Sequence, residues 1–180
     1  MPASRLDIET SKRREHDYYD ELAAGYDELH REEQERKIRL ILDNFEIGEK
    51  EKLLDVGCGT GFSLEMWPSK HVTGAEPSAA MIRQAPKDVQ ARIMHVRAED
   101  MSIFDDHEFD VVVSVTAIHN FTGIEDGLRE MKRVGKRTFA FSVLKKSEKL
   151  GEIDRLIRKH FTVSKVIDTD PHDRIYLIGR

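Results

Sequence analysis

The chain has 180 residues, of which 35% are charged and 39% hydrophobic, and its formal net charge at pH 7 is −5. This length predicts one domain with a single sizeable core, and no apolar stretch approaches the roughly 20 residues that a membrane-spanning helix needs. The single cysteine, Cys58, excludes an internal disulfide, and no clustered Cys, His and carboxylate residues show the spacing of a metal site. We therefore expect a cytoplasmic protein without a bound metal.

The N-terminal region has two parts. Residues 1–14 are polar and end in basic residues, which predicts a flexible arm. Apolar residues then recur at three- and four-residue steps, which predicts a helix through Tyr18 and Tyr26 and a second amphipathic helix after it. We expect residues 15–47 to hold these helices as a lid or substrate-binding part, and residues 52–180 to form the core of one domain.

Strand and helix patterns alternate over the rest of the chain. Near-continuous apolar runs predict parallel strands that are covered on both faces. These strands are expected at residues 52–56, 71–75, 91–96, 109–115 and 138–144. Helices are expected at residues 62–67, 78–85, 124–134 and 147–161, whereas residues 97–108 are too polar and short for a regular helix.

The end of the chain breaks this alternation. Two further strands, Val163–Ile167 and Arg174–Ile178, are joined by the short, turn-rich link DTDPHD. A parallel crossover needs a dozen or more residues, so these strands must pair antiparallel. The predicted fold class is α/β, with a Rossmann-like, doubly wound, mostly parallel seven-stranded sheet, an antiparallel C-terminal hairpin and helices on both faces.

Three glycines at alternate positions follow the first predicted strand. Gly57, Gly59 and Gly61 indicate a turn so tight that side chains would block its backbone angles or its ligand. Phe62 stands where a dinucleotide-binding fingerprint has its last glycine, which disfavours a pyrophosphate at the next helix. We expect Ser63, with Thr60, to cap that helix.

An acidic residue ends the second predicted strand. Glu76 lies 19 positions after Gly57, close to the spacing of about 20 at which a carboxylate binds ribose hydroxyls. Taken alone, the glycines could form a purely structural turn. The acidic strand end at this distance favours a nucleoside ligand.

These residues carry a resemblance to a known family. LLDVGCGTG followed by GAEPS resembles the first two motifs of the class I S-adenosylmethionine-dependent methyltransferases, of the small type 11-like kind. The likeness continues through FDVVVSVTAIHNF and LREMKRVGK and covers roughly residues 18–180. It implies S-adenosylmethionine as cofactor and methyl transfer as activity, and it leaves the methyl acceptor open.

The resemblance also implies a set of cofactor-binding residues. These are Asp55, Gly57, Cys58, Gly59 and Gly61 at the first loop, Glu76 at the ribose, Pro77 and Met81 on the adenine, Ala98 and Glu99 at the adenine edge, Val115 after the fourth strand, and Tyr26 in the lid. The family often has Asp where this chain has Arg97. The carboxylate role at the adenine edge therefore stays open between Glu99 and Asp100.

Three residues are candidates for the reaction itself. His119 and Asn120 are expected where the methyl group meets its acceptor. Tyr18 is expected to close the site together with Tyr19 and Tyr26, and one tyrosine hydroxyl among them is expected to reach the cofactor carboxylate. A structural histidine and ordinary helix packing of the tyrosine are the alternatives. Asn120 is not followed by Pro-Pro-aromatic, which argues against methylases of amides and base nitrogens. Cys58, committed to the loop, disfavours covalent methylation of a pyrimidine carbon.

The acceptor and the partners are left as alternatives. A small molecule is one option, and a tRNA or protein presented with a small activator protein is another. The segment Arg129–Lys159 has eleven Lys and Arg against four Asp and Glu, which gives the RNA option mild support. A non-catalytic S-adenosylmethionine-binding module is the rival from another class, and a nicotinamide dehydrogenase is a weaker one. We expect a monomer or homodimer.

Overall fold

The computed structural model describes residues 31–179, which form one seven-stranded sheet. The strands are β1 (Lys52–Val56), β2 (His71–Ala75), β3 (Ile93–Met94), β4 (Phe109–Val115), β5 (Gly135–Leu144), β6 (Val163–Ile167) and β7 (Asp173–Ile178). Their order is β3-β2-β1-β4-β5-β7-β6. Pairs among the first five strands are parallel, whereas β7 pairs antiparallel with both β5 and β6. The predicted fold class is confirmed.

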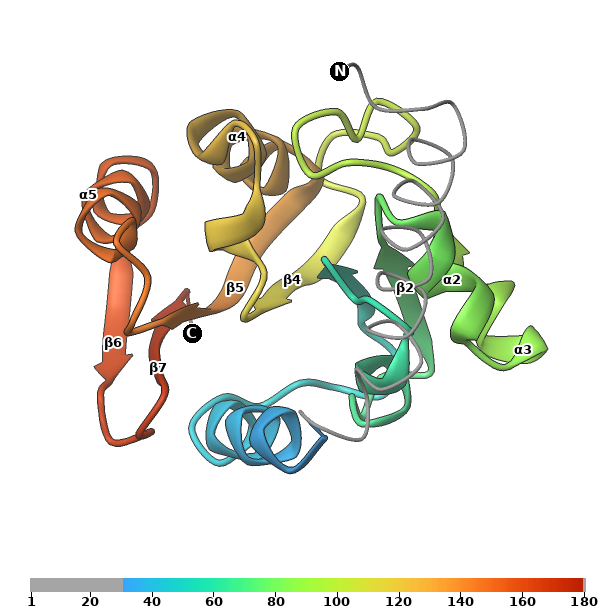
Figure 1. The fold of residues 1–180 in the computed structure, drawn as a ribbon, viewed down its shortest axis with the longest axis horizontal. Coiled ribbons are helices and arrows are strands. Elements are labelled where there is room, and N and C mark those ends of the chain that lie inside the picture. Colours follow the sequence, from blue (N-terminus) through green and yellow to red (C-terminus); the bar gives the residue numbers. More distant parts are fainter. Residues whose placement is uncertain (1–30, 180) are drawn as a thin grey trace, which may run out of the picture.

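Helices cover both faces of this sheet (Figure 1). The helical segments are residues 31–42, η1 (Phe62–Glu65), α2 (Ala79–Gln84), α3 (Lys87–Gln90), η2 (Ile118–Asn120), α4 (Ile124–Val134) and α5 (Leu150–His160). Helices α4 and α5 lie together on one face, and the helix at residues 31–42 lies on the other. Among residues 31–179, no helix combines the length and the apolar character that a bilayer-spanning segment requires.

The side-chain alternation of the strands produces two hydrophobic cores. In β1, Leu54 and Val56 point into the core under α4 and α5, and Leu53 points into the core under the 31–42 helix. In β4, Val112 joins the first core and its neighbours join the second. Each such side chain, when fully buried, contributes about 1.5–3 kcal/mol. The near-continuous apolar runs of the sequence are thus explained by burial on both faces.

Two elements near the site differ from the sequence-based expectation. The helix expected at residues 62–67 is a short 3₁₀ turn, because Gly61 precedes it without a side-chain cap. Ser63 does not cap this turn, since its hydroxyl donates a 2.6 Å hydrogen bond to Asp55 Oδ2. The strand expected at residues 91–96 is reduced to β3, in which Ile93 is buried and Met94 is 37% exposed.

The N-terminal predictions fall mostly outside the described part of the chain. The expected arm at residues 1–14 and the lid residues Tyr18 and Tyr26 lie before residue 31, so these predictions remain predictions. The second expected helix is present at residues 31–42.

Candidate functional site

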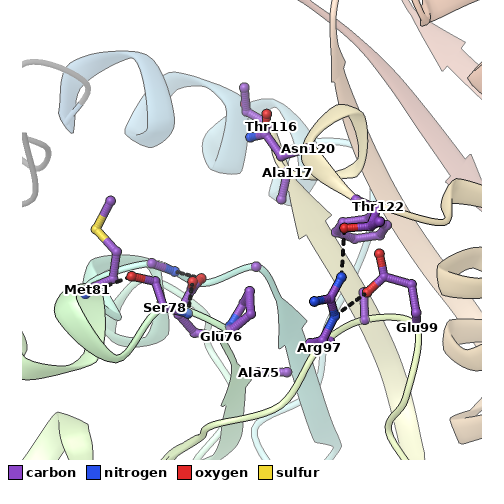
Figure 2. A pocket seen from close by; sticks show the side chains of 15 residues that line it. Ala75, Glu76, Ser78, Met81, Arg97, Glu99, Thr116, Ala117, Asn120 and Thr122 are labelled. Carbon is purple, nitrogen blue, oxygen red and sulfur yellow. Dashed lines mark hydrogen bonds and ion pairs between the residues drawn. The ribbon is translucent and has the colours of Figure 1, made fainter. Parts of the chain in front are cut away.

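A cavity of about 340 Å³ lies at the carboxyl ends of the parallel strands, where β1 and β4 meet and the strand order reverses. Ligands of open α/β sheets bind at such a point, and this volume lies within the range of small-molecule sites. The lining residues come from four segments at or just after the ends of strands: Gly57 and Gly59; Ala75, Glu76, Pro77, Ser78 and Met81; Arg97, Ala98 and Glu99; Thr116, Ala117, Asn120, Phe121 and Thr122. Figure 2 shows these side chains around the cavity.

The first glycine lets two loops approach closely. Gly57 has φ +79°, and its amide donates a 2.7 Å hydrogen bond to the carbonyl of Ala75. A Cβ atom at this position would lie 2.4 Å from Cβ of Ala117, in the loop after β4. Glycine is therefore required here both by the backbone angle and by the contact.

Two other predicted residues of the loop face the protein interior. Gly61 has φ +77°, and an added Cβ would lie 2.6 Å from Cγ1 of Val89. Cys58 is buried with its sulfur against Gly74 of β2, and burial, followed by the charges of nearby carboxylates, raises the pKa of its thiol well above the usual value. Cys58 thus acts as a packing residue with a protonated thiol.

Glu76 occupies the end of β2 beside this loop. Its Oε2 accepts a 2.9 Å hydrogen bond from the amide of Gly59, and its Oε1 accepts one of 2.9 Å from the amide of Ser78. Burial raises the pKa of Glu76, against the opposing effect of these two amides. A carboxylate has about four lone-pair positions, so about two remain. They suit a pair of neighbouring hydroxyl groups.

Asp55 lies beneath the loop and does not line the cavity. Its Oδ2 accepts hydrogen bonds from the hydroxyl of Ser63 at 2.6 Å and from Nε1 of Trp67 at 2.9 Å. Burial raises its pKa to about 6, although both hydrogen bonds lower it. Asp55 therefore ties η1 and the residues after it to the end of β1.

A second wall of the cavity joins the loop after β3 to the loop before α4. Nη2 of Arg97 donates a 2.6 Å hydrogen bond to Oγ1 of Thr122, and its Nε lies 3.5 Å from Oε2 of Glu99. The amide of Gly123 donates a 3.0 Å hydrogen bond to Oε1 of Glu99. Figure 2 shows this wall across the cavity from Glu76. The contacts of Arg97 with Thr122 and of Glu99 with Gly123 thus join the two loops that form this wall of the cavity.

The loop after β4 begins with a strained residue. Thr116 has φ +56°, which is uncommon for a β-branched residue. Its Oγ1 donates to Oδ2 of Asp173 at 2.7 Å and accepts from Nζ of Lys37 at 2.9 Å. Lys37 and Asp173 are both fully buried and form an ion pair of 3.0 Å. This buried pair holds Thr116 at the cavity and connects the cavity to the 31–42 helix.

The two candidates for the acceptor side are neighbours in η2. Asn120 lines the cavity, whereas His119 does not. Nδ1 of His119 is buried and has no hydrogen-bond partner among residues 31–179. Burial lowers the pKa of His119, as do Lys149 and Lys37, while Asp173 opposes them. The lowered pKa of His119 favours its neutral form.

The structure thus divides the predicted site residues into three groups. Gly57, Gly59, Glu76, Pro77, Met81, Ala98, Glu99 and Asn120 surround one cavity. Asp55, Cys58, Gly61, Val115 and His119 lie outside its lining, and Tyr18 and Tyr26 lie outside the described residues. Sequence reasoning missed Ala75, Ser78, Arg97, Ala117, Phe121 and Thr122. The last three follow β4 directly, so extending the strand-end rule through that whole loop would have found them.

The glycine turn, the carboxylate at the end of β2 and the position of the cavity define a nucleoside-binding protein of the doubly wound α/β class. Residues 54–141 match the family model described as a methyltransferase domain. These residues form a class I S-adenosylmethionine-dependent methyltransferase domain, and the ribose hydroxyls of its cofactor, S-adenosylmethionine, fit the acceptor oxygens of Glu76. Within residues 31–179, no three or more His, Cys, Asp and Glu side chains converge as metal ligands do.

Known proteins similar to the chain agree with this assignment. The chain is 28% identical over 166 residues to an uncharacterized protein of Methanocaldococcus jannaschii, covering 84% of this chain and 65% of that protein. It is 35% identical over 120 residues to the demethylmenaquinone methyltransferase of Chlorobaculum tepidum, covering 64% of this chain and 48% of that enzyme. The chain therefore spans less than two thirds of the length of these relatives.

A solved structure shares the fold at lower identity. It is a chain from the complex between the Haloferax volcanii Trm112 methyltransferase activator and a methyltransferase. The TM-score is 0.68 with 17% identity, covering 90% of this chain and 98% of that chain. This likeness is one of fold alone.

Proposed function

We propose that this protein transfers the methyl group of S-adenosylmethionine to an acceptor by in-line displacement. The observation that carries the proposal is the position of Glu76, hydrogen-bonded to Gly59 at the switch point of the sheet. In this proposal the remaining lone pairs of Glu76 bind both ribose hydroxyls. Gly57 and Gly59 pass along the methionine part, and Met81 and Pro77 cover the adenine.

The protein contributes binding and alignment to this reaction. When bound, the cofactor supplies an electrophilic methyl carbon on a sulfonium group. The cavity residues hold donor and acceptor in line, and such alignment alone lowers barriers by up to roughly 7–11 kcal/mol. In this proposal Asn120, which lines the cavity, orients the acceptor.

The acceptor pocket is proposed to lie between the loop after β4 and the segment before β1. Support comes from Lys37 of the 31–42 helix, which bonds to Thr116 at the cavity. The proposed domain division keeps residues 15–47 as lid or substrate-binding part, and this contact supports it for the helix at residues 31–42. The tyrosines at positions 18 and 26 belong to that proposal.

We propose a small molecule as the acceptor. Many Lys and Arg side chains of the basic segment Arg129–Lys159 form ion pairs with neighbouring acidic residues. Lys159 pairs with Glu125, and Arg133 pairs with Glu130. These ion pairs reduce the positive charge that the segment could offer to an RNA phosphate backbone. The name of the Chlorobaculum relative also points to a small acceptor. An acceptor presented with an activator protein is the alternative, favoured by the fold likeness to the Haloferax chain.

Methyl-labelled S-adenosylmethionine tests these proposals. The protein is incubated with the labelled cofactor and, separately, with a metabolite, a tRNA and a protein fraction of a cell extract, each with and without the remaining extract proteins. We expect label in the metabolite fraction, and none with the Glu76→Ala variant. Label in tRNA or protein that depends on added extract proteins supports the activator alternative instead. Tight cofactor binding without label in any fraction contradicts methyl transfer and supports a binding module.

A further inference from the structure

The side of the cavity formed by the loop after β4 has no ionisable lining residue among residues 31–179. Its lining residues are Thr116, Ala117, Asn120, Phe121 and Thr122. Figure 2 shows Thr116, Ala117 and Asn120 together on this side. The carboxylates that line the cavity, Glu76 and Glu99, come from the segments after β2 and β3. The described residues beside Asn120 therefore include no lining carboxylate, imidazole or amine that could take a proton from a methyl acceptor.

A lysine at the start of α5 lies beside this loop. Nζ of Lys149 donates a 3.1 Å hydrogen bond to the carbonyl oxygen of His119. This oxygen belongs to the peptide bond that joins His119 to Asn120, so the ammonium lies next to a residue that lines the cavity. Lys149 is exposed, and within residues 31–179 it forms no ion pair with an acidic side chain. An ammonium has three N–H donors, so donors remain for a ligand.

The other charges around η2 do not offset that of Lys149. Lys37 is fully buried and pairs with Asp173 at 3.0 Å, so these two charges compensate each other. Glu33 lies 3.8 Å from Lys37, but it is not among the groups that shift the pKa of His119. The charged groups that do shift it are Lys149, Lys37 and Asp173, two positive and one negative. The surroundings of η2 are therefore net positive.

An anionic methyl acceptor fits both observations. Transfer to a hydroxyl requires a base that removes its proton, whereas a carboxylate is already ionised at neutral pH, because its usual pKa is about 4. We infer that the methyl acceptor is a small carboxylic acid, that Lys149 and the side-chain amide of Asn120 bind one of its carboxylate oxygens, and that the other oxygen is methylated. This inference rests on the proposed function and names the chemical class of its acceptor.

The transfer is balanced without moving a proton. A lone pair of the unbound carboxylate oxygen forms the new bond to the methyl carbon. The bond between this carbon and sulfur breaks, and its electron pair stays on sulfur. The negative carboxylate and the positive sulfonium thus become a neutral methyl ester and a neutral thioether. Because the carboxylate loses its charge, Lys149 binds the substrate more strongly than the transition state, and loss of Lys149 is expected to raise KM rather than lower kcat.

Methyl-labelled S-adenosylmethionine and the deproteinised metabolite fraction of a cell extract test the inference. Mild alkali hydrolyses methyl esters, so label on a carboxylate is released as volatile methanol, whereas methyl groups on nitrogen or in ethers stay on the product. We expect most of the label that the wild-type protein transfers to become volatile, above a reaction without protein. We also expect an anion exchanger at neutral pH to retain the acceptor.

Variants of Lys149 test its part in binding the acceptor. Lys149→Gln is expected to raise the amount of metabolite fraction needed for half-maximal labelling by about tenfold, because a charged hydrogen bond is lost. Its maximal rate is expected to stay within about twofold of the wild-type rate. Lys149→Arg keeps the charge and is expected to retain most of the binding. Lys146→Gln, at an exposed lysine of the same segment before α5, changes the net charge equally and is expected to have no effect.

Other outcomes overturn the inference in distinguishable ways. Label that stays on the metabolites after alkali shows methyl transfer to another kind of atom, so the proposed function stands and the carboxylate class is wrong. Volatile label with equal half-maximal amounts for folded Lys149→Gln and Lys146→Gln shows that Lys149 does not bind the acceptor. Label only in tRNA or protein shows that the acceptor is not a small molecule. If no fraction takes up label from a protein that binds S-adenosylhomocysteine, methyl transfer is itself wrong and the inference falls with it.

Discussion

The backbone amide of Gly59 donates a 2.9 Å hydrogen bond to Oε2 of Glu76, across 17 positions of sequence. This bond joins the glycine loop after β1 to the end of β2. It orients the carboxylate with a backbone N–H that every substitution of Gly59 except proline retains. The remaining lone pairs of Glu76 thereby face the cavity in a fixed geometry.

The first prediction concerns this carboxylate. Glu76→Gln replaces one acceptor oxygen by the NH2 group of a carboxamide. This NH2 group then faces either the backbone amide of Gly59 or a ribose hydroxyl. We expect the affinity for S-adenosylhomocysteine to fall by about tenfold to a hundredfold, because a charged hydrogen bond to the ligand is lost. Isothermal calorimetry measures the change.

The control for this substitution is Glu152→Gln, at an exposed position of α5. Its affinity is expected to equal that of the wild-type protein. An affinity of Glu76→Gln within twofold of the control would show that Glu76 does not bind the ribose.

The second prediction compares glycines of the same loop. Gly57→Ala and Gly61→Ala both force a side chain into a positive-φ position and into contacts of 2.4 and 2.6 Å. Each is expected to lower the free energy of unfolding by about 2–4 kcal/mol through strain and overpacking. Of these two glycines only Gly57 lines the cavity, so Gly57→Ala is expected to weaken cofactor binding more than Gly61→Ala. Urea unfolding and calorimetry measure the two effects.

Gly151→Ala in α5 is the matched control, because nothing lies within 4 Å of the added Cβ. It is expected to stabilise the protein by roughly 0.5–1 kcal/mol, as alanine does in helices. Equal effects of the three substitutions would contradict the assigned role of the loop geometry.

The third prediction concerns the pH dependence of stability. Burial raises the pKa of Asp55 to about 6 in the folded protein, from 3.8 when exposed. The folded state therefore holds the proton more tightly, and the stability that Asp55 contributes below pH 3.8 is lost as the pH rises through about 6. Asp55→Asn keeps an oxygen acceptor for Ser63 and Trp67 but does not ionise.

Urea unfolding at several pH values between 4 and 7.5 measures this effect. The stability of Asp55→Asn relative to the wild-type protein is expected to increase with pH, by up to about 3 kcal/mol. Other titrating groups are common to both proteins and cancel in the difference. A difference that does not change with pH would show that Asp55 titrates normally.

Some elements were predictable because their signals are local. Strands β1, β2 and β4 and helix α4 match their predicted bounds, since each is an apolar or amphipathic run between turn residues. The short β3 was not predictable, because its end depends on how far β2 extends beside it. The hydrogen bond between Asp55 and Trp67, 12 positions apart, was not predictable either, nor was the one between Arg97 and Thr122, 25 positions apart. Both depend on how separate segments pack together. A strand end indicates where a site lies, but tertiary packing decides which side chains face it.

The last prediction concerns the buried ion pair behind the cavity. Lys37→Met leaves Asp173 buried without its cation, which is expected to cost about 3–5 kcal/mol of unfolding free energy. Lys37→Met combined with Asp173→Asn removes the uncompensated charge, so part of this loss is expected to be recovered. The exposed pair of Lys70 and Glu49 at 2.6 Å supplies the control, and Lys70→Met is expected to cost at most about 1 kcal/mol.

Because Lys37 and Asp173 both hold Thr116, the double variant is also expected to bind the cofactor more weakly than Lys70→Met. Unfolding losses of equal size in Lys37→Met and Lys70→Met would show that the buried pair contributes no more to stability than an exposed pair.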